Sequence, residues 1–166
     1  KDLFTEFEIS KHKEFCEEHQ NKYPVINISL KDIKADNWEL CFDSFQKEIS
    51  TLYKKFQFLL DSDDLDATDK QIFRQIITRT ANETDIKHSL ADLSQYLKNQ
   101  FKKNVIVLVD EYDTPIINAF KNTNKPIKSI DKENKTYYEK VIDFLQTFLG
   151  KAYKGNNALK KGLITG

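Results

Sequence analysis

The run Val105-Ile106-Val107-Leu108-Val109 is the longest uninterrupted apolar stretch of this 166-residue chain, and two acids follow it directly, Asp110 and Glu111. Five consecutive apolar residues suit a central strand of a parallel sheet, which is covered on both faces. The run is far too short to cross a bilayer. We therefore expect a sheet built around residues 105–109.

Two further stretches, residues 24–30 and 162–165, also have the character of strands. Between the strands, apolar residues recur every three or four positions, as in helices that bury one face. The inward positions fall into four groups: Trp38, Cys41, Phe45, Ile49, Leu52, Phe56 and Leu59; Ile72, Phe73, Ile76 and Ile77, with Asp66 or Thr68 as N-cap; Leu90, Leu93, Leu97 and Phe101; and Tyr138, Val141, Leu145, Phe148 and Ala152. Polar residues 122–134 are expected to form the longest loop. Strands that alternate with helices indicate a layered α/β fold.

The composition bounds the class of protein. Lys and Arg number 26, as do Asp and Glu, so the formal net charge is zero, which argues against direct nucleic-acid binding. The length suits one domain, and neither a signal peptide nor a disulfide framework is visible. We expect a soluble, cytoplasmic domain. Because the chain starts on Lys1, has no Met and stops just after an apolar segment, we interpret it as a fragment of a longer protein.

The two acids after the apolar run are the strongest sign of chemistry. In open α/β sheets, ligands bind at the carboxyl ends of the strands. An acid at that edge can hold Mg²⁺, and a second can polarise an attacking water. Neighbouring residues of a strand point to opposite faces, so Asp110 and Glu111 need a bend to share a site; we assign that bend to the residues leading to Pro115. The simpler alternative is an acid that only ends a strand.

Residues 105–116, VIVLVDEYDTPI, resemble the Walker B segment of the bacterial AAA-ATPase-like family. These relatives of the P-loop NTPases often carry a PD-(D/E)XK nuclease-like domain. Residues 13–34 resemble the family's second strand and its approach, residues 37–56 the long helix behind it, and residues 148–166 the run into the sensor strand. The resemblance implies a parallel-sheet, P-loop NTPase-like fold of AAA or STAND type, with residues 1–166 forming one domain fragment.

The resemblance also implies roles for individual residues. Asp110 would coordinate Mg²⁺, Glu111 would be the general base, and Thr165 would be the polar sensor near the γ-phosphate. Asp113 matches a family position, but a structural cap is an equal alternative. The implied cofactors are ATP and Mg²⁺, and the implied partner is an attached nuclease-like effector domain.

One departure from the family pattern is the missing Walker A segment. No Gly-x-x-x-x-Gly-Lys-[Ser/Thr] occurs in the chain, and Gly150-Lys151 is followed by Ala152. We expect that the phosphate-binding strand, absent here, pairs beside residues 162–165, with the Walker B strand between the second and the sensor strands. The chain alone is then expected neither to bind ATP tightly nor to hydrolyse it. The alternative is a non-catalytic interaction or regulatory module on the same scaffold.

Other groups of polar residues have weaker interpretations. His12, Cys16 and His19 would lie on one helical face, but three ligands from one helix form a poor zinc tetrahedron, so we expect Phe15 and Cys16 to pack inward. The acidic run 61–69 lacks the central Gly and terminal Glu of a calcium loop. Glu133-Asn134-Lys135 has nuclease-like letters but falls in the predicted loop.

Overall fold

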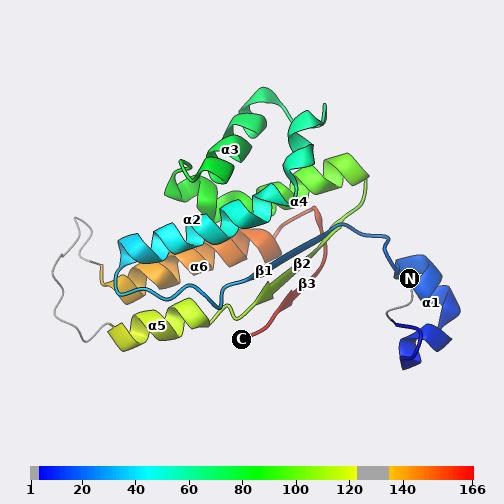
Figure 1. Cartoon of the computed structure of the whole chain (residues 1–166), viewed down its shortest axis with the longest axis horizontal. Coiled ribbons are helices and arrows are strands. Elements are labelled where there is room, and N and C mark those ends of the chain that lie inside the picture. The colour runs from blue at the N-terminus through cyan, green and yellow to red at the C-terminus, as the bar shows by residue number, and fades with distance from the viewer. Residues whose placement is uncertain (1–3, 123–134) are drawn as a thin grey trace.

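The chain forms a three-stranded parallel sheet with helices packed on it (Figure 1). This computed structural model describes residues 4–122 and 135–166. The strands are β1 (Val25–Ser29), β2 (Val105–Asp110) and β3 (Leu159–Ile164), in the order β1-β2-β3. The sequence prediction of a parallel α/β fold with the apolar run as its middle strand is therefore confirmed.

Six α-helices and two 3-10 turns lie before and between these strands within the described residues. They are η1 (Glu8–Lys11), α1 (Lys13–His19), α2 (Trp38–Lys54), η2 (Gln57–Asp61), α3 (Ala67–Thr78), α4 (Glu83–Phe101), α5 (Thr114–Asn122) and α6 (Tyr137–Tyr153). Polar side chains cap the long helices by accepting a backbone N–H of the first turn: Asn37 caps α2, Asp66 caps α3, Asn82 caps α4 and Thr136 caps α6. Of the two caps predicted for α3, Asp66 is the correct one.

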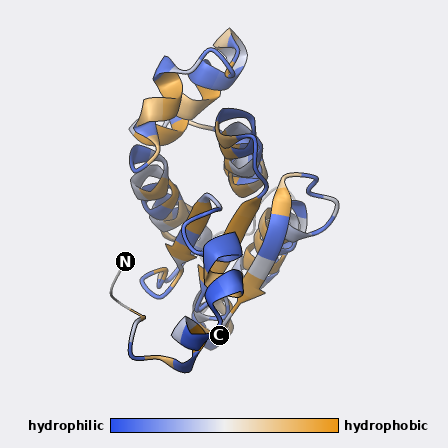
Figure 2. Cartoon of the chain, turned by 90° about the vertical axis from the view of Figure 1, so that its right-hand side faces the viewer, coloured by the Kyte–Doolittle hydropathy of each residue, from blue (hydrophilic) through white to orange (hydrophobic). Residues whose placement is uncertain are grey.

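The core lies between the sheet and the layer of α2, α4 and α6, and α3 forms an outer layer on α2 and α4 (Figure 1). Phe45 of α2 and Phe144 of α6 meet there, with ring centroids 4.4 Å apart, and both side chains are fully buried. In Figure 2 the middle of the sheet is coloured hydrophobic, β3 carries hydrophilic colour along part of its length, and the helices mix the two colours.

The face of the sheet that points away from the long helices is only partly covered. Alternate residues of β2 are buried, but Ile106 and Leu108 between them are only half-buried. On the neighbouring strands, Val25 is 44% exposed and Leu163 is 58% exposed. The expected burial on both faces is thus wrong for the described residues, in which the long helices cover one face.

Strand β3 forms one edge of the sheet and is exposed over most of its length. It begins three residues before the predicted start and is shifted in register where it passes Val105 and Ile106. Its Gly162 lies directly against the ring of Tyr153 on α6, so that a Cβ built on this glycine would fall 2.2 Å from the ring. The Tyr153 hydroxyl donates to the carbonyl of Leu163 at 3.2 Å. Gly162 therefore allows α6 to pack closely on β3.

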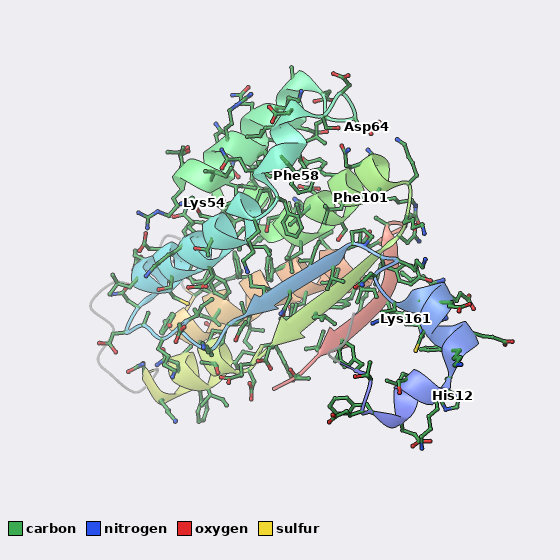
Figure 3. The ribbon with its side chains drawn as sticks, turned by 45° about the vertical axis from the view of Figure 1, so that its right-hand side comes forward. His12, Lys54, Phe58, Asp64, Phe101 and Lys161 are labelled. Atoms are coloured by element: carbon green, nitrogen blue, oxygen red, sulfur yellow. The ribbon has the colours of Figure 1, made fainter. Side chains whose placement is uncertain are left out.

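Some helical predictions need correction. The first apolar stripe is interrupted after Lys54, where α2 ends, and Leu59 is buried from η2 instead. Phe101 is half exposed and lies beside Phe58, with ring centroids 6.1 Å apart, at the surface of the helical layer (Figure 3). Phe15 is 52% exposed and does not pack inward. Residues 123–134 of the predicted loop lie outside the described residues, and Asn122 ends α5.

Helix length and hydropathy bear on a membrane location. Among the described helices, none is both long enough and apolar enough to cross a bilayer.

Candidate functional site

The candidate site lies at the carboxyl edge of the sheet, where β2 ends in Asp110. Asp110 is exposed, and its register partner on β1 is Ser29. The N–H of Leu30 donates to the Asp110 carbonyl at 2.9 Å, which continues the ladder past the end of β1. The predicted placement of an acid at the end of the central strand is confirmed, at the edge where open α/β sheets bind ligands.

Thr165 lies beside Asp110 on the other side. Its hydroxyl donates to Asp110 Oδ1 at 2.5 Å, and its backbone N–H donates to the carbonyl of Val109 at 2.9 Å. The carbonyl of Thr165 accepts the N–H of Tyr112 at 3.2 Å. Three hydrogen bonds therefore fix Thr165 against the acidic segment, so the structure brings together two of the three residues proposed from the sequence.

Glu111 forms a bend directly after Asp110. Its φ is +51°, a left-handed conformation that is uncommon for a residue with a side chain. Its carboxylate Oε2 accepts the hydroxyl hydrogen of Thr114 at 3.1 Å, at the first residue of α5. The chain therefore turns at Glu111 itself. This bend comes before the residues leading to Pro115, to which the sequence analysis assigned it.

Asp113 contributes to the start of α5 through its backbone. Its carbonyl accepts the N–H of Ile117 at 2.8 Å, the first hydrogen bond of that helix. Its side chain lies close to Gly166: a Cβ built on Gly166 would fall 2.9 Å from the Asp113 carboxyl carbon. This geometry matches the structural alternative for Asp113, as a residue that begins a helix.

Helix α5 is tied to the loop after β1 by two asparagines. Asn118 Oδ1 accepts the N–H of Ala35 at 2.9 Å, and the Asn122 amide donates to the Ala35 carbonyl at 3.2 Å. The Tyr137 hydroxyl, from the start of α6, donates to the same carbonyl at 3.3 Å. These bonds hold the helix that carries Thr114, and through it Glu111, in a fixed position relative to β1.

The donor set at this edge suits a hard cation that keeps most of its water. Within residues 4–122 and 135–166, no three His, Cys, Asp or Glu side chains gather so as to hold a metal by themselves. Mg²⁺ usually binds one or two carboxylates together with water and substrate phosphate. The exposed carboxylate of Asp110, between Ser29 at the end of β1 and Thr165 just after β3, fits such a partial shell.

His12, Cys16 and His19 belong to another part of the molecule. His12 lies between η1 and α1 in the N-terminal segment, away from the layer of long helices (Figure 3). The Cys16 thiol donates to the Ile9 carbonyl, and His19 packs its ring on Phe15 at 4.5 Å between centroids. Gly150-Lys151 lies inside α6, so it cannot act as a phosphate-binding loop between a strand and a helix.

A polar hollow of about 480 Å³ lies at the first turns of α2, α4 and α6. Trp38 forms part of its wall, and Lys87 pairs with Glu83 at 2.6 Å across its α4 side. Neither Asp110 nor Thr165 lines it. The hollow is therefore separate from the acidic edge.

Three residues that form this edge or hold α5 beside it were missed by the sequence analysis: Ser29, Thr114 and Asn118. Thr114 follows the acids closely, and its position before proline at a helix start was a signal that could have found it. Ser29 and Asn118 depend on pairing over 81 and 83 residues of sequence. No local pattern carries that information.

The fold and this edge define a class of protein: an α/β protein with a parallel sheet, compatible with a P-loop NTPase-like fold. A family model described as Predicted AAA-ATPase matches residues 1–166, and the chain therefore belongs to this AAA-ATPase-like family. Neither the curated proteins nor the solved structures contain a match to the chain.

Proposed function

We propose that this chain forms the ATP-binding and ATP-hydrolysing core of a longer cytoplasmic protein. The observation that carries the proposal is the hydrogen bond between Asp110, at the end of the central strand, and Thr165, the residue that directly follows β3. Membership of the AAA-ATPase-like family supports it. The acids then have a task beyond ending a strand.

In this proposal, Asp110 holds Mg²⁺ through its free oxygen and coordinated water. The cation, when bound, neutralises charge on the phosphates. Thr165 orients the Asp110 carboxylate and presents a polar group toward the γ-phosphate. Glu111 accepts the proton of the attacking water, a contribution on the order of 10²–10⁴ in rate. For that step the Glu111 carboxylate must leave the Thr114 hydroxyl or share it, because the present hydrogen bond uses Oε2.

Binding of the phosphates requires a part that this sequence lacks. We propose that a Walker A strand of the same polypeptide pairs along the free edge of β3. The exposed Leu163 and Ile164, at 58% and 39%, support an edge that is covered in the complete protein. Residues 1–166 alone then neither bind ATP tightly nor hydrolyse it, since backbone amides and a lysine normally hold the β- and γ-phosphates. We extend the proposal to an attached nuclease-like effector domain, on the strength of the sequence resemblance.

The experiment is a comparison of Glu111→Gln with the unaltered complete protein. We expect ATP binding to persist and turnover to fall by at least about 100-fold. Glu17→Gln, an exposed glutamate on α1, is the matched control and should keep full turnover. Full turnover in Glu111→Gln would contradict the role of Glu111. Nucleotide binding without any turnover in the unaltered protein would favour the regulatory module instead.

A further inference from the structure

Ser29 occupies the position on β1 that corresponds to Asp110 on β2. The two residues are register partners, and the preceding pair, Ile28 and Val109, is buried toward the helices. Because side chains alternate along a strand, Ser29 and Asp110 both belong to the opposite, more open face. Adjacent strands lie about 4.8 Å apart, so the two side chains are neighbours.

Thr165 extends the same row on the other side. Ile164 pairs with Val109, so the next residue, Thr165, lies beside Asp110, and their hydrogen bond confirms this contact. A hydroxyl, a carboxylate and a second hydroxyl therefore stand in a row across three strands at the carboxyl edge. Serine, aspartate and threonine all offer oxygen atoms, which are the ligands that Mg²⁺ and its bound water prefer.

The two hydroxyls of this row differ in their hydrogen bonds. The Thr165 hydroxyl donates to Asp110 Oδ1 at 2.5 Å. Ser29 Oγ receives only a long contact from the N–H of Lys31, at 3.5 Å, and within the described residues its own hydrogen is donated to no protein group. Ser29 is half-buried at an edge whose carboxylate has one oxygen already engaged. Its hydroxyl is thus available to a ligand held by Asp110.

We propose that Ser29 is a binding residue for the hydrated divalent cation held by Asp110, acting through a water of that cation. This inference rests on the proposed function, which it deepens by adding a residue from β1 to the cation site. The simpler alternative is that Ser29 only closes the turn after β1 through Lys31. Removal of a group that orients metal-bound water typically lowers metal affinity 10–100-fold, and we expect about tenfold at this exposed edge.

The test uses Mn²⁺ alone as probe on the isotope-labelled chain, because Mn²⁺ accepts the same oxygen ligands and broadens nearby NMR signals. The amide protons of Leu30 and Tyr112 flank the row and report local binding. Ser29→Ala should weaken the Mn²⁺ affinity about tenfold. Ser29→Thr keeps a hydroxyl and should bind as the unaltered chain does. Ser44→Ala is the matched control, since this half-buried serine only donates within α2, to Leu40.

The outcomes separate this inference from the proposed function. Unchanged Mn²⁺ affinity in Ser29→Ala, with binding lost in Asp110→Asn, overturns the role of Ser29 and leaves the proposed function in place. Binding that persists in Asp110→Asn, or no local broadening in the unaltered chain, overturns both the inference and the metal role of Asp110. Should Ser29→Ala fail to fold, Ser29→Cys gives the same comparison, because a thiol is a poor ligand for Mn²⁺.

Discussion

The hydroxyl of Thr165 donates a hydrogen bond to Asp110 across 55 residues of sequence, and so joins the carboxyl ends of β3 and β2. Replacement by valine keeps the shape of the side chain but removes the donor. We expect Thr165→Val to lower the free energy of unfolding by about 1 kcal/mol, measured by urea denaturation. Thr165→Ser should recover most of that loss. Equal stability of the valine and serine variants would show that the bond contributes nothing.

The contact between Gly162 and Tyr153 predicts a strong effect of one added methyl group. In Gly162→Ala the new Cβ would meet the Tyr153 ring at 2.2 Å, so the ring, α6 or β3 must shift. We expect a loss of about 2 kcal/mol in the free energy of unfolding. Gly150→Ala in α6 is the control, because no atom lies within 4 Å of its added Cβ. There we expect a gain of about 0.5–1 kcal/mol. Similar effects at both glycines would contradict the close contact.

The left-handed conformation of Glu111 predicts that glycine is favoured at this position over alanine. Both substitutions remove the carboxylate bonded to Thr114, so their difference isolates the backbone. We expect Glu111→Gly to be more stable than Glu111→Ala by about 1 kcal/mol in thermal or urea unfolding. At Glu48, inside α2, the same pair of substitutions should rank in the reverse order. A reversed order at position 111 would exclude the left-handed turn.

Asp92 on α4 predicts a pH dependence of stability. Burial raises its pKa to about 6 from 3.8, with Asp69 and Asp85 raising it further and His88 opposing them. The folded state therefore disfavours the charged carboxylate, so its contribution to stability is fully present below about pH 4 and is lost as the pH rises to about 6. Asp92→Asn should gain stability over the unaltered chain across this window, on the order of 1–2 kcal/mol at pH 7.

The measurement for Asp92 is the difference in free energy of unfolding between the two proteins from pH 4 to pH 7. Asp63→Asn, at an exposed position, is the matched control for loss of one negative charge. A difference between Asp92→Asn and the unaltered chain that does not change with pH would contradict the burial of this carboxylate.

The central strand and its terminal acid were predictable because their signals are local. Five apolar residues followed by acids specify a central strand and the nature of its end, although only one face of that strand is fully buried. The turn at Glu111 was not predictable in the same way: the nearby Pro115 is the obvious signal, yet the neighbouring strands hold the backbone of Glu111 itself in a left-handed conformation. Tertiary contacts determined this turn.

The surroundings of the site depend on partners distant in sequence. The Ala35 N–H donates to Asn118 and the Ala35 carbonyl accepts from Asn122, and both asparagines are more than 80 residues away in sequence. The exposure of Phe15, with a helical position typical of a core residue, likewise reflects the absence of an apposed surface in the described residues. Periodicity indicates which face of a helix is apolar, but it does not show whether another element covers that face.

The uneven distribution of charge along the edge strand β3 has a consequence for handling the isolated chain. Lys160 and Lys161 repel a second molecule at the start of the strand, whereas Gly162, Leu163 and Ile164 leave its other half without charge. Added salt screens the lysines, so concentrated samples should self-associate more readily at high ionic strength than at low. Purification at low ionic strength would therefore keep the isolated chain monomeric.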